Sequence, residues 1–231
     1  MKVALTLAAA LLLSGCSAGA TVTQTAATST GDAAFHGREP LQPTPRPSFV
    51  LTDTSGKPYD FAAETAGRPT LLYFGYTNCP DECPTAMADI AGALRATPAL
   101  LRGRTRVVFV TTDPDRDTGP LIRRFLDQFS TGIVGLRGTQ AQVDAAAAAT
   151  GVAAAQKQGA IATLPGQPDQ HVHAAGTAAH EHAGPLGYGV GHADTIFAFD
   201  TADRLSVLYD GARRPSDIAA DLPLLALGDN P

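Results

Sequence analysis

Two cysteines, Cys79 and Cys83, lie four positions apart in the segment YFGYTNCPDECPTAM, directly after an apolar run. A pair with this spacing can form a structural disulfide, exchange electrons as a dithiol, or supply two ligands to a metal ion. A structural disulfide stabilises a protein mainly when it closes a long loop, and this loop is very short. The spacing therefore argues against a structural disulfide and leaves the other two possibilities open.

The position of the pair in the chain predicts how the thiols behave. Residues 70–76 are a continuous apolar and aromatic run, typical of a strand buried on both faces, and residues 85–97 follow with helical spacing. A thiol at the N-terminus of a helix lies at the positive end of the helix dipole, so we expect a lowered pKa and a populated thiolate. A four-residue spacing across this helix start also brings both sulfurs to the same side of the turn.

Four histidines lie close together farther along the chain, in HVHAAGTAAHEH: His171, His173, His180 and His182. Histidine-rich tracts bind metals such as copper or zinc, but this is an inference from composition alone. The surrounding residues 158–189 are rich in Gly, Ala, Pro and His without any period, which is typical of a flexible insertion. A weak metal-binding tract and a plain solvated insertion both fit the sequence.

The third cysteine, Cys16, follows a segment typical of an export signal. Met1-Lys2 is positively charged, Val3 to Leu13 is apolar, and LSGC resembles a bacterial lipobox, where the chain is cut before the cysteine and lipid is attached. We expect a lipoprotein signal peptide over residues 1–15 and a lipid on Cys16. The alternative is an ordinary signal peptide with an incidental cysteine. Lipidation predicts anchoring at the cell membrane, with the domain on the extracytoplasmic side.

The composition narrows the classes of function. The chain has 231 residues, with 17 Lys and Arg against 22 Asp and Glu and a net charge of -5. Nucleic-acid binding needs a dense basic surface, so we do not expect it. No later stretch offers the roughly 20 apolar residues of a membrane-spanning helix.

The rest of the sequence predicts the elements that position the cysteines. Residues 16–46 are rich in Ala, Thr, Gly and Pro, which predicts a flexible tether. Two short strands, at 49–51 and 59–61, predict a hairpin. We expect further strands at 105–111, 133–136, 195–199 and 205–209. They alternate with helices at 118–129 and 139–150 and with a last helix that Ser216 caps. Thr139 and Gln142 form a capping box at the start of the helix at 139–150. The alternation predicts one α/β domain over residues 47–227.

Three motifs in order carry a family resemblance. FGYTNCPDECP, then TTDPDRDT at residues 111–118, then YGVGH at residues 188–192 resemble the SCO (synthesis of cytochrome c oxidase, SenC-type) copper proteins. The resemblance implies a thioredoxin-like α/β fold with an N-terminal β-hairpin extension, here with the His-rich insertion before the C-terminal hairpin. It also implies that Cys79, Cys83 and His192 bind one copper ion.

The residue types fit this implication. Two thiolates and one imidazole form a soft three-ligand set that suits Cu(I) and accepts Cu(II), whereas structural zinc normally takes four protein ligands. One departure concerns His192. The family often has Asp-His-Ser, but this chain has Gly191-His192-Ala193, so a carboxylate that could orient the imidazole is missing. Asp194, two residues later, is a candidate replacement.

The second motif contains Asp113 and Asp117. Asp113 follows a predicted strand, at the sheet edge where α/β proteins collect their sites. We expect Asp117 or Thr118 to cap the following helix, and we assign no definite role to Asp113.

The resemblance implies an envelope copper chaperone rather than an enzyme with turnover. Its expected partner is the cytochrome c oxidase subunit that carries the Cu(A) site, or another copper carrier. The alternative is a thioredoxin-like thiol-disulfide reductase or redox sensor, which needs only the CxxxC dithiol formed by Cys79 and Cys83.

Overall fold

The computed structural model describes residues 35–42, 44–152, 156–159, 188–191 and 194–228, of which the side chains of 156–159 and 188–191 are not described. All of these residues belong to one folded unit, Ala33–Pro231. Cys16, the four histidines of residues 171–182, and His192 lie outside the described residues.

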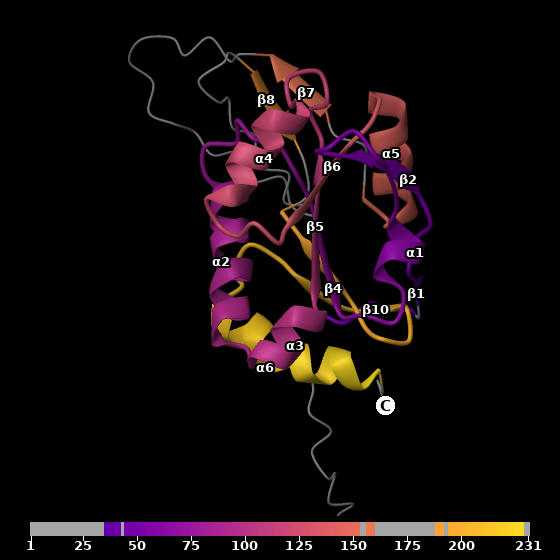
Figure 1. Cartoon of the computed structure of the whole chain (residues 1–231), viewed down its shortest axis with the longest axis vertical. Coiled ribbons are helices and arrows are strands. Elements are labelled where there is room, and N and C mark those ends of the chain that lie inside the picture. Colours follow the sequence, from indigo (N-terminus) through magenta and orange to yellow (C-terminus); the bar gives the residue numbers. More distant parts are fainter. Residues whose placement is uncertain (1–34, 43, 153–155, 160–187, 192–193, 229–231) are drawn as a thin grey trace, which may run out of the picture. The chain divides into compact units, whose positions relative to one another are not determined.

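Within the described residues, eight strands form one sheet, in the order β1-β10-β9-β4-β5-β6-β2-β3 (Figure 1). The strands are β1 (Thr44–Pro45), β2 (Val50–Asp53), β3 (Pro58–Asp60), β4 (Thr70–Gly75), β5 (Arg106–Thr111), β6 (Val134–Arg137), β9 (Ile196–Phe199) and β10 (Arg204–Tyr209). The central strands β4, β5 and β6 run parallel, whereas β9 pairs with β4 in the antiparallel direction. The sheet therefore combines a parallel centre with antiparallel sides.

The central strand β4 precedes the cysteine motif. All six of its residues are buried, as expected for an apolar run in the middle of a sheet. Gly75, its last residue, lies opposite Thr111, the last residue of β5. The parallel pairing thus brings the cysteine motif and the TTDPDRDT motif to the same edge of the sheet.

Helices cover both faces of the sheet (Figure 1). One apolar cluster packs α2, α4 and α6 against one face, and a second packs α1 and α5 against the other. The helices are α1 (Phe61–Thr65), α2 (Glu82–Ala96), α3 (Ala99–Arg104), α4 (Gly119–Asp127), α5 (Gln140–Ala149) and α6 (Pro215–Leu227). The predicted capping box of Thr139 and Gln142 is confirmed at the start of α5.

Two expected boundaries are wrong. The tether was expected to extend to residue 46, but β1 pairs with the end strand β10, and Arg46 is buried. The folded unit therefore begins before residue 47.

Ser216 does not cap α6, because the helix starts at Pro215 and its N-cap residue is Arg214. Proline is well suited to the first position of a helix, where its missing N–H has no partner to lose.

Two further strand pairs bear on the expected hairpin and insertion. β2 and β3 pair in the antiparallel direction, and β2 also joins the main sheet through β6. β7 (Gln156–Gly159) and β8 (Tyr188–Gly191) form a separate two-stranded pair with Gln156 opposite Gly191. The stretch 158–189 was expected to lack regular structure, but its two ends pair with each other.

Candidate metal centre

The cysteine pair lies at the junction of β4 and α2. Both side chains are buried; Cys83 is fully buried and Cys79 is 7% exposed. Both are present as thiols rather than as a disulfide. The backbone N–H of Cys83 donates to the Cys79 sulfur at 3.3 Å, while the N-cap residue Asp81 makes no side-chain capping bond. The Cys79 sulfur therefore acts as the acceptor at the start of the helix, where an N–H donor favours negative charge on it.

The expected behaviour of the second thiol is wrong. Burial raises the pKa of Cys83 well above its ordinary value, and the neighbouring Cys79 raises it further. Cys83 is the second residue of α2, so its sulfur does lie at the helix start. Burial removes the thiolate from water, and this cost outweighs the attraction of the helix dipole. In the absence of a bound cation, the structure favours a protonated Cys83.

Tyr73, on β4, connects Cys83 with the start of β9. Its hydroxyl lies 3.8 Å from the Cys83 sulfur and 3.0 Å from Oδ1 of Asp194. Burial raises the pKa of Tyr73 well above its ordinary value, so the side chain is a neutral phenol. The hydroxyl is therefore a hydrogen-bonding group placed directly beside one of the two sulfurs.

Asp194 forms a buried ion pair with Arg213, which lies between β10 and α6. Nη1 of Arg213 donates to Oδ2 of Asp194 at 3.0 Å, and the two side chains are 1% and 3% exposed. Burial alone would raise the pKa of Asp194, but the hydrogen bond and charge of Arg213 outweigh it, and the net pKa is lowered. Asp194 is thus an ionised carboxylate held between Arg213 and the Tyr73 hydroxyl.

Asp117 holds the loop that leads to Cys79. Its carboxylate accepts hydrogen bonds from the backbone N–H of Thr77 at 3.0 Å, from the Thr77 hydroxyl, and from the Thr111 hydroxyl. The expected capping role is wrong for its side chain, and Thr118, the N-cap residue of α4, makes no side-chain capping bond either. Asp117 therefore links the second motif to the first.

Asp113 is also buried at this edge. It pairs with Arg116, whose guanidinium lies over the ring of Tyr76 at 5.8 Å from the ring centre. Tyr76 in turn accepts a hydrogen bond on its backbone carbonyl from the N–H of Cys79 at 3.3 Å. Asp113 thus supports the residues around the cysteine loop.

Only part of the expected ligand set lies in the described part of the chain. There, Cys79 and Cys83 come together, and no group of three or more His, Cys, Asp or Glu side chains is arranged to hold a metal ion. Sequence reasoning missed Tyr73 and Arg213. Tyr73 looks like an ordinary core aromatic within the run TLLYFG, and no local pattern relates Arg213 to a site more than a hundred residues earlier.

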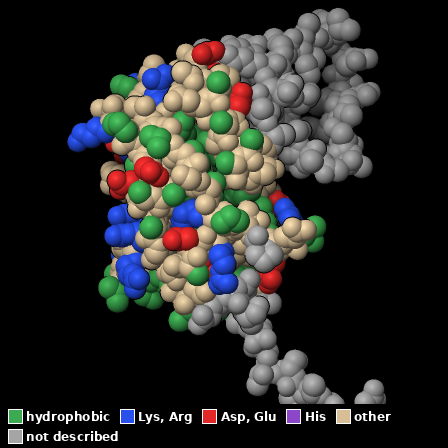
Figure 2. Space-filling view, turned by 90° about the vertical axis from the view of Figure 1, so that its right-hand side faces the viewer, with side chains coloured by type: hydrophobic (Ala, Val, Ile, Leu, Met, Phe, Trp, Pro, Cys, Tyr) green, Lys and Arg blue, Asp and Glu red, His purple; other side chains and the backbone are tan. Residues whose placement is uncertain are grey.

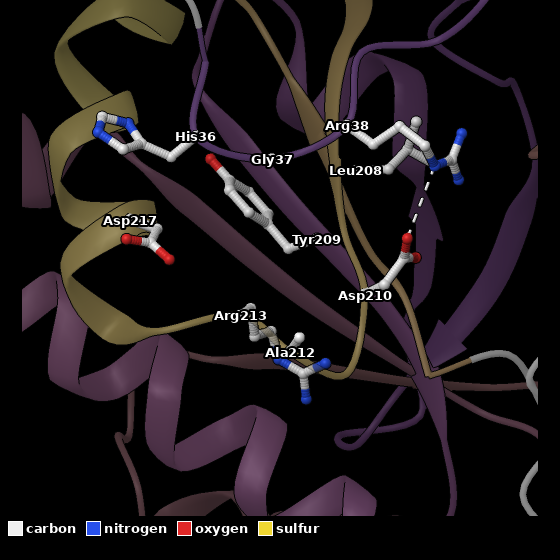
Figure 3. Close-up of a pocket in the computed structure, with 9 residues that line it drawn as sticks. All are labelled: His36, Gly37, Arg38, Leu208, Tyr209, Asp210, Ala212, Arg213 and Asp217. Carbon is white, nitrogen blue, oxygen red and sulfur yellow. Dashed lines mark ion pairs between the residues drawn. The ribbon is translucent and has the colours of Figure 1, made fainter.

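A separate open cavity of about 190 Å³ lies between the N-terminal segment and the start of α6 (Figure 3). His36 and Asp217 lie on one side of it, and Arg38 and Asp210 on the other. No cysteine lines this cavity. On the face drawn in Figure 2, acidic and basic side chains are interspersed among apolar ones.

Comparison with known proteins identifies the relatives of this chain. The SCO1/SenC family model matches residues 38–226. The chain is 35% identical over 107 residues to a putative copper-binding protein of Stutzerimonas stutzeri, covering 46% of this chain and 52% of that protein. It is 37% identical over 103 residues to protein SenC of Rhodobacter capsulatus, covering 39% and 45%. The chain thus matches about half the length of these curated relatives.

Comparison with solved structures also finds Sco proteins that are similar to this chain. The chain is similar to the apo Sco1 protein of Thermus thermophilus, with 30% identity, a TM-score of 0.64 and coverage of 83% of this chain and 97% of that one. It is also similar to copper-bound ScoI of Bradyrhizobium japonicum, with 28% identity, a TM-score of 0.60 and coverage of 79% and 99%.

The fold and the site together define a thioredoxin-like α/β protein with a CxxxC dithiol at the end of a central strand. The match over residues 38–226 makes the assignment specific: the chain belongs to the SCO1/SenC family. The predicted family and fold are confirmed.

Proposed function

We propose that this protein is an envelope copper chaperone that carries one copper ion for assembly of the Cu(A) site of cytochrome c oxidase. The observation that carries the proposal is the pair of cysteine sulfurs held together at the start of α2 in a chain of the SCO1/SenC family. The copper-bound ScoI of Bradyrhizobium japonicum, 28% identical to this chain, supports copper as the cargo.

The residues present fit copper. Thiolates are soft ligands that favour Cu(I), and a bound cation would favour loss of the Cys83 proton despite its raised pKa. Cys79 is slightly exposed as a residue, so the cysteine pair lies next to the surface, where a partner protein can take the ion. Two thiolates also leave coordination positions open, which suits an ion that must be handed on.

We propose His192 as the third ligand. Asp194, two residues later in the chain, is hydrogen-bonded to Tyr73, whose hydroxyl is 3.8 Å from the Cys83 sulfur. His192 is thus a close neighbour in sequence of a residue linked to the cysteine site through Tyr73, which supports it as a ligand to the same ion as Cys79 and Cys83.

Anaerobic titration of the reduced full chain in detergent tests the copper site. We expect one tightly bound copper per chain and, for Cu(II), thiolate-to-copper charge-transfer bands that vanish in Cys79→Ser and Cys83→Ser. His192→Ala should weaken binding and alter these bands, whereas Cys16→Ser should leave them unchanged. If the unmutated protein shows no thiolate-to-copper bands, the proposed Cu(II) site is wrong.

The second candidate function is thiol-disulfide exchange, and it is favoured by the closeness of the two sulfurs, one of which accepts the N–H of the other cysteine. This function needs only Cys79 and Cys83. If His192→Ala binds copper as the unmutated protein does while the dithiol still reduces a disulfide substrate, the redox function is the better account.

We also propose that the chain is anchored in the membrane by a lipid on Cys16. The proposal rests on the export signal and the LSGC motif. In the part of the chain that the structure describes, no helix is long and apolar enough to cross a membrane. Expression of Cys16→Ser should move the protein from the membrane fraction to the soluble fraction, while retention in the membrane would contradict this anchor.

A further inference from the structure

The edge of the domain formed by α3 and α6 carries basic and apolar side chains together. The two helices pack against each other, and they lie side by side at the lower end of Figure 1. Residues 95–106, which contain α3, include four arginines and no Asp or Glu, although the whole chain has a net charge of -5. This edge is therefore a positive patch on an acidic protein.

The arginines of this edge are not neutralised by neighbouring carboxylates. Arg95, Arg102 and Arg104 are exposed, and none of them forms an ion pair within the described residues. Arg102 only approaches backbone carbonyls, the nearer being that of Thr97 at 3.4 Å. These guanidinium groups are thus available to anions from outside the protein, and their planar set of donors suits phosphate.

Two leucines protrude from the same pair of helices. Leu100 on α3 is 82% exposed, and Leu227 at the end of α6 is 70% exposed. Ala220 and Pro223, which are also exposed on α6, carry no charge. Exposed leucines beside arginines that lack a carboxylate are typical of a protein surface that lies on a membrane, where guanidinium groups contact lipid phosphates and leucines enter the acyl boundary.

The N-terminal segment joins the fold on α6. Phe35 packs against the apolar cluster to which α6 contributes, and the backbone N–H of His36 donates to the Asp221 carboxylate of α6 at 2.9 Å. Cys16, for which we propose a lipid, lies 19 positions before Phe35 in the sequence. A short connection to a lipid anchor raises the effective concentration of membrane surface near α6, which favours lipid over a protein as the occupant of this edge.

We propose that the α3–α6 edge, defined by Arg95, Leu100, Arg102, Arg104 and Leu227, docks the domain on a membrane surface by binding anionic phospholipid headgroups. The choice of lipid as the occupant rests on the lipid anchor of the proposed function. The binding itself does not need that anchor, so the two are tested separately.

Docking through this edge sets the orientation of the cysteine site. β5 begins at Arg106, directly after the turn that follows α3, and its last residue Thr111 pairs with Gly75 at the end of β4, where the cysteine motif follows. A six-residue strand spans about 20 Å. Cys79 and Cys83 therefore lie at the end of the strands opposite to the α3–α6 edge, on the side of the domain away from the bilayer, where a partner protein can reach them.

Vesicle binding tests the surface without the lipid anchor. The protein is the chain from residue 16 onward with Cys16→Ser, which keeps the whole folded unit Ala33–Pro231. We expect it to bind phosphatidylglycerol vesicles, to bind them less as salt is raised, and not to bind phosphatidylcholine vesicles. Arg102→Gln/Arg104→Gln should lower the partition coefficient about tenfold or more. Equal binding to the two kinds of vesicle, or binding to neither, would overturn the proposal.

Lys57→Gln/Arg124→Gln is the matched control. It removes the same charge from exposed positions elsewhere, on the turn between β2 and β3 and on α4. We expect this variant to bind phosphatidylglycerol vesicles within about twofold of the chain that carries only Cys16→Ser, because charges beyond a Debye length from the membrane are screened. An equal loss in both double variants would show that net charge alone governs binding and would contradict a defined docking surface.

The chain contains no tryptophan, so a single introduced one serves as a local probe. With Leu100→Trp, we expect the emission to move to shorter wavelength on phosphatidylglycerol vesicles and to be quenched by brominated lipid, because the ring enters the acyl boundary. Val50→Trp replaces another exposed apolar residue, 52% exposed on β2, and should show neither change. Equal changes at both positions, or no change at position 100, would overturn the proposed orientation.

Two further measurements separate lipid docking from its alternatives. A dimer in solution that Leu100→Ser dissociates would assign the α3–α6 edge to a second copy of the chain and overturn the proposal. In cells, a salt wash releases protein that is held on the membrane by this edge alone. Retention of full-length Cys16→Ser after the wash would therefore contradict the lipid anchor, while the vesicle experiments still decide whether the edge binds lipid.

Discussion

The sulfurs of Cys79 and Cys83 have different surroundings although only four positions separate them. The Cys79 sulfur accepts a backbone N–H from the first turn of α2, and Cys79 as a residue remains slightly exposed. The Cys83 sulfur is fully buried against β4, beside Tyr73. A cation or a thiol partner would therefore meet Cys79 first, and the Cys83 thiol gives up its proton only when charge or bonding compensates for its burial.

Gly75 supplies the space that the Cys83 sulfur occupies. A Cβ at this position would lie 2.8 Å from that sulfur and 2.7 Å from the ring of Tyr73. We expect Gly75→Ala to displace the sulfur and to lower copper affinity at least tenfold, with a loss of about 1–3 kcal/mol of stability from overpacking. Copper titration and urea unfolding measure the two effects. Gly132→Ala, where the nearest atom is 3.6 Å away, should change neither.

Part of the site could be predicted from the residues themselves. The position of Cys79 and Cys83 at a strand-helix junction follows from the apolar run and the helical spacing around them. The raised pKa of Cys83 does not, because it depends on how deeply tertiary packing buries one residue. The same holds for Asp194, whose partners Tyr73 and Arg213 are 121 and 19 positions away in the chain.

At the scale of elements, the N-terminal segment is a structural part of the domain. Arg38 exchanges backbone hydrogen bonds with Leu208 on β10, and β1 pairs with the same strand. The sequence of this segment is rich in Pro and has no apolar period, so it predicts a tether. Its contacts are with the far end of the chain, and a local pattern cannot reveal them. The central strands, by contrast, were predictable because long apolar runs are their direct signature.

His36 gives this segment a dependence on pH. Its Nδ1 lies 2.6 Å from the buried carboxylate of Asp221, whose hydrogen bond and charge raise the pKa of His36. The charge of Asp217 also raises this pKa, and the charge of Arg214 lowers it. The contribution of protonated His36 to the stability of the fold is therefore fully present below its pKa in the unfolded chain, about 6.5, and is lost as the pH rises through its higher pKa in the folded chain. Urea unfolding between pH 5.5 and 8.5 should show this loss in the unmutated protein relative to His36→Gln. Parallel curves for the two proteins would contradict it.

Arg46 attaches the segment to the sheet through a guanidinium with several partners. It donates to the Thr65 hydroxyl at 2.9 Å, to the Asp200 carbonyl at 2.9 Å and to Asp203 at 2.9 Å, with its side chain 3% exposed. Lysine cannot reproduce this planar set of donors. We expect Arg46→Lys to lower the free energy of unfolding by about 2–4 kcal/mol, because buried acceptors lose their partners.

Urea denaturation measures the Arg46→Lys effect. The control is Arg95→Lys on the exposed side of α2, which should change stability by less than about 0.5 kcal/mol. An Arg46→Lys protein as stable as this control would show that the guanidinium contacts contribute little.

At the scale of the whole molecule, segments from both ends of the folded unit meet at β10. The strand lies between β1 and β9 in the sheet, and the next element in the chain, α6, carries the Asp221 that binds His36. Because these contacts join the two ends of the folded unit, its stability depends on residues before 47. It also places Arg213, at the β10-α6 junction, against the start of β9 and the cysteine site.

Truncation distinguishes the two possible domain boundaries. A chain that starts at residue 35 keeps His36, Arg38, β1 and Arg46, and we expect its thermal unfolding to match that of the unmutated protein. A chain that starts at residue 47 loses all of these contacts. We expect it to be less stable by about 3–5 kcal/mol, or to fail to fold. Equal melting temperatures for the two truncated chains would show that the fold does not need residues 35–46 and that the domain begins at residue 47.

The hydrogen bond from the Cys83 amide to the Cys79 sulfur has a spectroscopic consequence. The amide proton senses the electron density on that sulfur, so its chemical shift differs among thiol, disulfide and metal-bound forms. A single backbone resonance at the first turn of α2 thus serves as a built-in indicator of the state of the site. It can be followed in the intact protein without a label on either cysteine.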